Sequence, residues 1–409
     1  MYHAFRRARW ILILGFLCAA PSHVLADDKT PEDTESIRRK TPSGGYVDPA
    51  SFFRFHGYVS LSYTEAGNAL GAAADGTPHI LVSSPGPVAR TGTNPGGFRN
   101  DSALFVGGEP FEGVGGLIEI HFVGDATDPV ITEAKLTWDL METPRRSLRL
   151  IAGRYWWPFG IHNDEWFSAN NRFALLSPAA TETVPTHYNE VGVMLEGEAY
   201  LGAELGLNYA LSVGNGVPSF SLMPNVRATG ADSNDDRSLS GRMGLILETG
   251  VRSEIGFSLA GGQLRDAEDP TLTATDPDRY RGDFNAWGGD LAFQWQAFAL
   301  RSYYYSSKED LRAAPQSQLQ RDGFTIEPSY SLHFARERYS TITILGRYSA
   351  ADEETLGMGS LQRRQLGLGI NVQITHSFVA KLGIITQGEG AQLPSVDNDA
   401  FTLSLTNVF

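Results

Sequence analysis

The stretch 201-LGAELGLNYALSV-213 decides the fold class, because its side chains alternate strictly between two kinds. The apolar positions share one parity: Leu201, Ala203, Leu205, Leu207, Tyr209, Leu211 and Val213. The small or polar positions share the other: Gly202, Glu204, Gly206, Asn208, Ala210 and Ser212. Successive side chains of a β-strand point to opposite faces, so this period of two predicts a strand with one apolar face. The same alternation recurs in 251–259 and 365–374, and no long window keeps the helical i, i+3, i+4 spacing, so the chain is predicted to be all-β.

The overall composition removes two other classes of protein. The chain has 409 residues, with 33 Lys and Arg against 47 Asp and Glu, and a formal charge of −14. Such an acidic excess argues against a nucleic-acid-binding protein. The longest apolar run, 10–20, is about half of the ~20 residues that a membrane-spanning helix requires. A basic nucleic-acid binder and a helical membrane protein are therefore excluded.

The N-terminal segment has the features of a secretory signal peptide. Three arginines within 6–9 precede the apolar run, and the small residue Ala26 follows it. We expect cleavage after Ala26, which removes residues 1–26 and with them Cys18, the one cysteine of the chain. An exported chain without cysteine is not a disulfide-stapled fold. Residues 27–50 are charged, rich in Pro, Gly, Ser and Thr, and predicted to form a flexible periplasmic linker.

The rest of the chain, 51–409, contains sixteen segments with strand alternation. They are predicted at 52–64, 99–107, 114–123, 130–140, 147–157, 188–198, 201–213, 237–248, 251–263, 284–296, 298–308, 322–334, 338–349, 361–374, 377–388 and 400–409. Connections after even-numbered strands are mostly short, as at 249–250, whereas those after odd-numbered strands are mostly long and polar, as at 214–236. A soluble β-sandwich has no reason to sort its loops in this way, but transmembrane barrels join short periplasmic turns with long extracellular loops. We therefore predict a transmembrane antiparallel β-barrel of about 16 strands in the bacterial outer membrane.

Aromatic residues and the end of the chain agree with this fold class. Aromatic side chains cluster near the predicted strand ends, as membrane-interface girdles do, at Phe52, Phe53, Tyr63, Trp156, Trp157, Trp287, Trp295, Tyr303 to Tyr305 and Tyr330. The last predicted strand ends in Phe409. It resembles the C-terminal signature of bacterial outer-membrane proteins, which the barrel assembly machinery reads as an assembly signal.

The polar face of each strand is predicted to line a lumen. The inward basic residues are Arg54, Lys135, Arg149, Arg242, Arg252, Arg301, Arg347 and Lys381. The inward acidic residues are Glu119, Glu133, Asp139, Glu204, Glu248, Glu254, Asp290 and Glu327. Inward glycines are expected to leave space and so to favour an open lumen over a closed, filled barrel: Gly202, Gly206, Gly244, Gly256, Gly288, Gly367 and Gly369.

The stretch 153-GRYWWPFG-160 resembles the Gly-x-x-x-x-Pro-Phe-Gly motif found early in porins of the phosphate-selective porin O and P type. The signal peptide, the strand count and the terminal Phe extend this resemblance over most of the chain. The resemblance implies a homotrimeric diffusion channel whose third extracellular loop, near 158–187, folds inward and narrows the pore. Candidate constriction residues in this loop are His162, Asp164, Glu165, Trp166, Asn170, Asn171 and Arg172. The alternative is that they hold the loop against the barrel wall.

The phosphate selectivity of that family is not expected to extend to this chain. The inward residues comprise eight basic and eight acidic side chains, and a balanced lumen does not create the positive potential that concentrates phosphate. The sequence therefore favours passive diffusion of small hydrophilic or ionic solutes. A closed barrel that binds a surface partner through its extracellular loops is the competing hypothesis.

Catalytic and metal-binding motifs are not found in the sequence. It has neither Gly-x-Ser-x-Gly nor HExxH, so no enzyme activity, cofactor or metal site is predicted. The acidic loops 232–236 and 266–278 could hold a divalent cation that bridges lipopolysaccharide, although a solvated acidic loop is the commoner case. Expected partners are outer-membrane lipid and lipopolysaccharide, the barrel assembly machinery, further copies of the chain and small solutes.

Overall fold

The computed structural model describes residues 54–66, 97–123, 129–161, 172–173, 183–184, 189–218, 237–265, 282–311, 318–336, 339–355, 359–375, 377–389 and 399–409. The predicted signal peptide and periplasmic linker lie outside these ranges. Within them, no helix has the length and apolar character needed to cross a membrane.

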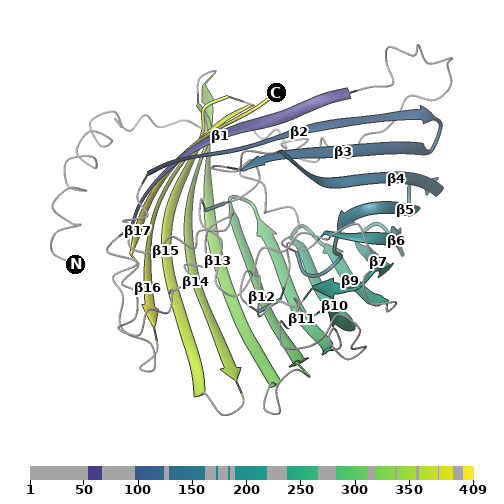
Figure 1. The fold of residues 1–409 in the computed structure, drawn as a ribbon. Helices are drawn as coiled ribbons and strands as arrows, with labels where there is room; N and C mark the ends of the chain where they lie inside the picture. The colour runs from purple at the N-terminus through teal and green to yellow at the C-terminus, as the bar shows by residue number, and fades with distance from the viewer. Residues whose placement is uncertain are drawn as a thin grey trace, which may run out of the picture. The chain divides into compact units, whose positions relative to one another are not determined.

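In the part of the chain that the structure describes, sixteen long strands and one strand of two residues make up a single sheet. Their bounds are β1 Arg54–Ala66, β2 Gly97–Phe111, β3 Val114–Val123, β4 Val130–Thr143, β5 Arg146–Trp156, β6 Asn189–Tyr200, β7 Leu205–Gly214, β8 Val217–Pro218, β9 Ser238–Glu248, β10 Arg252–Arg265, β11 Gly282–Trp295, β12 Phe298–Leu311, β13 Gln318–Arg336, β14 Tyr339–Thr355, β15 Gly359–Gln373, β16 Phe378–Glu389 and β17 Ala400–Val408. Figure 1 shows the long strands following one another around a ring in chain order.

The sheet is closed, because its first strand pairs with its last. β1 pairs antiparallel with β2 on one side and with β17 on the other, where Tyr58 lies opposite Val408. Gly57 and Phe409 exchange two backbone hydrogen bonds of 2.9 Å across this junction. The other long strands also pair antiparallel with their neighbours, and β8 adds a short parallel pairing with β10. Closure gives every long strand two partners and removes the sheet edges, which confirms the predicted sixteen-stranded antiparallel barrel.

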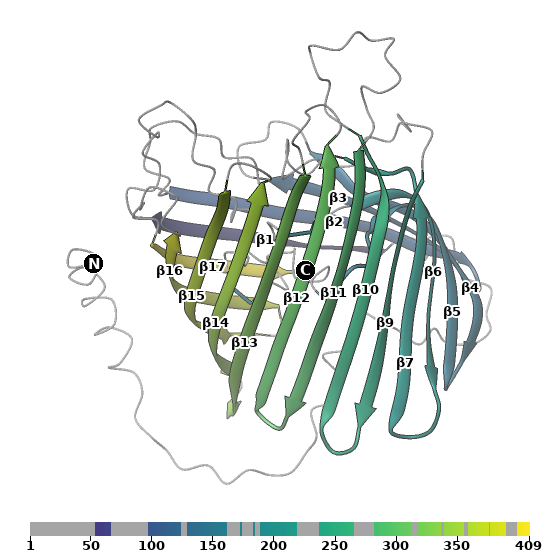
Figure 2. The same cartoon turned by 90° about the horizontal axis from the view of Figure 1, so that it is seen from below.

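The turns between strands follow the predicted order. Two-residue turns join β2 to β3 at 112–113, β4 to β5 at 144–145 and β11 to β12 at 296–297. Figure 2 shows such hairpins gathered at one end of the barrel. Short connections also join β6 to β7 at 201–204 and β9 to β10 at 249–251, whereas 157–188 after β5 and 266–281 after β10 are long, so loop length mostly alternates along the chain.

The two faces of the strands differ in the way that the alternation predicts. In the middle of β10 the apolar side chains of Ile255, Phe257 and Leu259 are exposed, and the buried positions between them are Gly256, Ser258 and Ala260. An apolar face that points outward from a closed barrel suits lipid, and a small or polar inner face suits a lumen.

One predicted strand begins later than expected. The alternation runs from Leu201, but 201–204 forms a bend and β7 starts at Leu205. The Leu201 N–H donates to the carbonyl of Leu205 at 2.8 Å, which closes a tight turn after β6. The alternation of apolar and polar residues thus includes 201–204, where the backbone turns, and this is why the predicted strand began too early.

Some of the predicted girdle residues lie on the outer face of the described strands, whereas Phe52 and Phe53 lie outside the described residues. Trp287 lies 5.3 Å from Tyr304 between ring centroids, and Trp295 and Tyr330 are about half exposed. The prediction was wrong for Trp157, Tyr303 and Tyr305, which are buried together inside the barrel.

Candidate pore constriction and lumen wall

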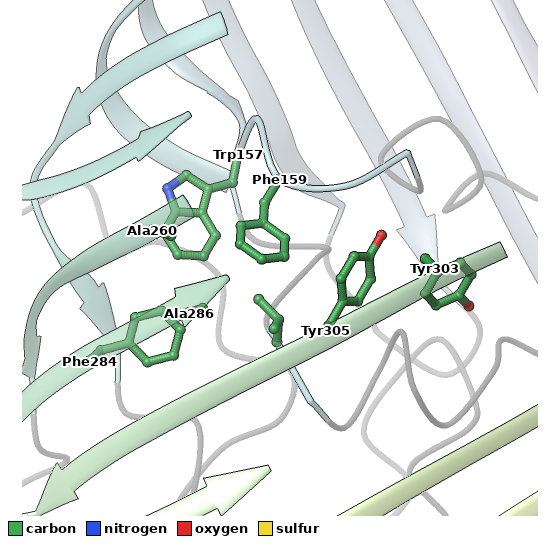
Figure 3. Close-up of a cluster of buried hydrophobic side chains, with 8 residues drawn as sticks. Trp157, Phe159, Ala260, Phe284, Ala286, Tyr303 and Tyr305 are labelled. Atoms are coloured by element: carbon green, nitrogen blue, oxygen red, sulfur yellow. The ribbon is translucent and has the colours of Figure 1, made fainter. Parts of the chain in front are cut away.

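The chain that leaves β5 turns onto the inner face of the wall formed by β10–β12. Trp157 and Phe159 are fully buried there, and Val184 from the far end of the same loop joins them. Their partners on the wall, drawn in Figure 3, are Ala260, Phe284, Ala286, Tyr303 and Tyr305. Ring centroids lie 6.0 Å apart for Trp157 and Phe284 and 5.3 Å apart for Phe159 and Tyr305. We call these eight residues the aromatic cluster.

Hydrogen bonds fix both ends of the loop to the same wall. The Gly160 N–H donates to Ser258 Oγ at 2.9 Å, and the Ser307 hydroxyl donates to the Thr183 carbonyl. Gly160 has a φ of 68°, and the Tyr305 hydroxyl occupies the space that a Cβ would need. The start and the end of the segment 157–184 are therefore both held at β10–β12.

A second contact lies farther along the barrel wall. Phe173 is buried against Gly367 and Gly369 of β15, and we call these two positions with Gly383 of β16 the glycine seat. Next to Phe173, burial lowers the pKa of the Arg172 guanidinium, and nearby Glu327 counteracts this change. The described parts of the loop thus reach from the β10–β12 wall to the β15–β16 wall.

Charged side chains on the inner face of β12–β14 form ion pairs. Arg321 binds Glu309 at 2.6 Å and Glu353 at 2.8 Å. On the neighbouring strand Arg347 binds Glu327, and both side chains are almost completely buried. Each of these arginines is therefore positioned by carboxylates rather than left to move freely.

Similar pairs occur on the other strands. Arg242 binds Asp290 at 2.6 Å and Glu254 at 2.7 Å, and Asn208 also donates to Glu254. Lys135 binds Glu133 at 2.6 Å. In a more exposed pair Arg149 binds Asp139 at 2.5 Å, with Glu196 at 3.6 Å. The pairs form a polar lining that runs around the inner face.

The buried charges differ between two walls that lie across the barrel from each other. In the sixteen-strand ring, β4–β6 lie half-way round from β13–β15. On β3–β6 the charged side chains that the structure buries are all acidic: Glu119, Glu133 and Glu190. On β13–β16 they are Arg321, Arg347 and Lys381 with one acid, Glu327. Several of these charges have a partner of opposite sign beside them, as Glu133 has Lys135 and Arg321 has Glu309, so the two walls differ in the sign of their buried members.

The predicted site residues can now be located. Fifteen of the sixteen inward candidates lie in strands and have the parity of the buried positions there: Arg54, Glu119, Glu133, Lys135, Asp139, Arg149, Arg242, Glu248, Arg252, Glu254, Asp290, Arg301, Glu327, Arg347 and Lys381. The prediction was wrong for Glu204, which lies in the exposed bend 201–204 before β7. Of the constriction candidates, Arg172 lies beside the glycine seat. The others lie outside the described residues: His162, Asp164, Glu165, Trp166, Asn170 and Asn171.

Several residues of the site were not found from the sequence. Arg321 and Glu309 fall one residue outside their predicted strands, although their parity marks them as inward. Glu190, which accepts hydrogen bonds from Ser238 and from the Gly216 N–H, has inward parity in a predicted strand. Phe173 had no local signal, because its seat comes from strands that lie far away in the sequence.

The inner glycines also differ from the prediction. The spaces above Gly244, Gly256, Gly288 and Gly367 are taken by the side chains of Asn208, Asp290, Tyr305 and Phe173. Only Gly202, among the seven positions considered, has no atom within 4 Å of a Cβ position. Most of these glycines accommodate a neighbouring side chain, so their number does not show how wide the lumen is.

Comparison with known proteins identifies the fold. No family model and no curated protein sequence matches the chain. The outer membrane channel DcaP of Acinetobacter baumannii superposes with a TM-score of 0.53 at 13% identity, over 90% of this chain and 100% of that one. The anion-selective porin from Comamonas acidovorans gives 0.52 at 11% identity, over 87% and 99%. OmpT, an outer membrane protein of Vibrio cholerae in trimer form, gives 0.52 at 11% identity, over 87% and 99%.

These structures share a closed barrel with this chain at identities that establish the fold alone. The barrel carries an apolar outer face on sixteen strands, which places it in a bacterial outer membrane. The chain has the fold of outer-membrane porins.

Proposed function

We propose that this protein is an outer-membrane porin through which small hydrophilic or ionic solutes diffuse passively toward the periplasm. The observation that carries the proposal is the division of buried charge between β3–β6 and β13–β16. A filled structural barrel has no need to keep acidic and basic side chains on facing walls. A channel uses the charges on such walls to orient dipolar solutes and to weigh anions against cations.

The loop near 158–187 is the proposed constriction. Its described residues contact two separate walls, which supports a path of the loop through the barrel interior. Residues between those contacts, including the candidates His162, Asp164 and Arg172, would then border the narrowest part of the channel. The resemblance of 153–160 to the porin O and P motif supports the same position for the loop.

The proposed assembly is a homotrimer surrounded by lipopolysaccharide. The proposed transport is passive and involves no enzymatic step. The trimer form of the Vibrio cholerae neighbour supports this assembly. The signal peptide 1–26, the linker 27–50 and the assembly signal at Phe409 belong to the same proposal. Phosphate preference is not part of it, because the buried lumen charges have both signs.

A closed barrel with a surface-binding role is the second candidate. The observation that favours it is the filling of the inner glycine positions by Asn208, Tyr305 and Phe173. If such filling continues across the whole interior, the barrel does not conduct, and the extracellular loops carry the function.

Single-channel conductance in a planar lipid bilayer tests the proposal. The wild-type protein should open in steps, in groups of three for a trimer, and deletion of 162–182 should raise the conductance of each step. Deletion of 268–278 in the loop after β10 is the matched control and should change it less. A folded wild-type barrel that never conducts would establish the closed alternative.

A further inference from the structure

Phe173 is held more specifically than packing alone requires. The wall opposite its ring has no side chain at Gly367, Gly369 and Gly383, three adjacent inner positions on β15 and β16. A Cβ at Gly367 or Gly369 would lie 3.2 Å or 3.0 Å from the Phe173 Cε1 atom. The ring therefore fills a shallow depression that any larger residue would close.

Two polar contacts fix the orientation of this segment. The Arg347 guanidinium carbon lies 4.2 Å from the centroid of the Phe173 ring, within the range of a cation–π interaction. The Asn371 Nδ2 group donates to the Arg172 carbonyl at 3.0 Å. The ring is held on its face by a cation, and the backbone beside it is held by an amide.

This geometry places a second guanidinium beside the first. Arg172 interacts electrostatically with both Arg347 and Glu327. Glu327 is already the ion-pair partner of Arg347, so two cations share one carboxylate. One guanidinium nitrogen of Arg172 is buried and has no hydrogen-bond partner among the residues that the structure describes. Arg172 thus adds a second guanidinium to the Arg347–Glu327 pair, on the wall opposite the buried acids of β4 and β6.

We propose that Arg172 sets the preference of the channel for anions, and that Phe173 is the positioning residue that holds it in place. The inference rests on the porin function proposed above. An oxyanion or halide that passes the loop experiences the positive potential of the Arg172 guanidinium, whose position is fixed by the contact of Phe173 with the glycine seat. Arg347 and Arg172 carry like charges and repel each other. The contacts of Phe173 and Asn371 hold the segment in place against this repulsion.

The aromatic cluster provides a contrast that argues against a packing role alone. Trp157 and Phe159 pack mainly against aromatic and alanine side chains, and Trp157 also contacts the Glu190 carboxylate through its indole N–H. Phe173 instead faces bare backbone and a guanidinium. The aromatic cluster already anchors the loop to the barrel wall. We therefore assign the contact of Phe173 with the glycine seat to the positioning of the Arg172 charge.

Reversal potentials in a potassium chloride gradient test this role. Arg172→Gln should shift the reversal potential toward that of a cation-preferring channel while the conductance of each step stays close to wild type. Arg172→Lys should restore part of the anion preference. Phe173→Ala should shift the potential in the same direction as Arg172→Gln, and Phe173→Leu should shift it less, because leucine still fills the seat.

The seat itself offers an independent variant. Gly369→Val should displace Phe173 from the wall side and reproduce the shift of Phe173→Ala. Gly346→Ala is the matched control, because this glycine lies on the outer face of β14, where a Cβ would make ordinary contact with Pro328 at 3.5 Å. Folding of each variant is checked by the heat-dependent mobility of the barrel on a gel.

The outcomes separate the inference from the function that it rests on. A conducting channel in which Arg172→Gln leaves the reversal potential unchanged would overturn the role of Arg172. A shift for Arg172→Gln without one for Phe173→Ala and Gly369→Val would show that Phe173 only packs. A folded wild-type barrel without conductance would overturn the porin proposal and this inference together.

Discussion

The loop after β5 meets the barrel at two places that differ in their chemistry. At the aromatic cluster, Trp157 and Phe159 are buried among side chains of β10–β12. At the glycine seat, Phe173 lies between bare backbone and the Arg347 guanidinium. The first contact removes a large apolar area from water, and the second brings together directional interactions around a charge.

This difference separates two tasks of the loop. Burial of apolar surface is strong but does not prescribe one orientation, so it suits an anchor. Cation–π contacts and hydrogen bonds are weaker but depend on direction, so they suit the placement of a functional group. We therefore expect variants of the cluster to change stability most and variants near lumen charges to change ion preference most.

The largest effect on stability is expected for Trp157→Ala. Removing a fully buried tryptophan from a packed cluster should lower the free energy of unfolding by about 3–5 kcal/mol. Equilibrium unfolding in denaturant, followed by tryptophan fluorescence, measures it. Trp287→Ala on the outer face is the control, because Trp287 is 46% exposed and loses fewer protein contacts. Equal losses for the two variants would show that the cluster stabilises the barrel no more than lipid contact does.

A smaller loss is expected for Ser258→Ala, which removes the acceptor of the Gly160 N–H. A buried backbone donor without a partner costs about 1–3 kcal/mol. The same unfolding experiment measures the change, and amide hydrogen exchange at Gly160 should become faster. Ser253→Ala, on the outer face of the same strand, should leave both quantities nearly unchanged. Unaltered exchange at Gly160 would mean that packing at Phe159 protects this amide without the hydroxyl.

The strands could be predicted from the sequence because alternation is a local property. The segment 114–123 coincides with β3, and the other fifteen predicted strands overlap the remaining long strands. The error at 201–204 has a local cause as well, since a tight turn between antiparallel partners can preserve the parity of apolar residues. Loop lengths then distinguished a membrane barrel from a sandwich without any knowledge of tertiary contacts.

The site was harder to predict because its parts are distant in the sequence. Arg172 and Asn371, which share a hydrogen bond, are 199 residues apart. Alternation marks Gly367 and Gly369 as inward but does not say which side chain covers them. For the same reason Trp157 was assigned to a girdle, although Phe284 and Tyr305 of other strands bury it inside the barrel.

The smallest effect on stability is expected for Arg149→Gln. This variant tests whether a charge on the barrel wall, away from the loop segment of Arg172, also affects ion preference. Arg149 binds Asp139 while 45% of its side chain remains exposed, so Arg149→Gln should change the free energy of unfolding by no more than about 1 kcal/mol. If passing ions sense both walls, the variant should still shift the reversal potential, because Asp139 and Glu196 would then face the lumen without their cation. Arg149→Lys keeps the charge and should behave like wild type.

The reversal-potential shifts of Arg172→Gln and Arg149→Gln, compared with each other, show whether the loop or the β5 wall determines ion preference. Arg149 lies on β5, half-way round the ring from the Arg347 strand, and is not held by the loop segment that positions Arg172. A larger shift for Arg172→Gln than for Arg149→Gln would place the selective step at the glycine seat. A larger shift for Arg149→Gln would place the selective step on the β5 wall, where the partly exposed Arg149–Asp139 ion pair would then determine which ions pass.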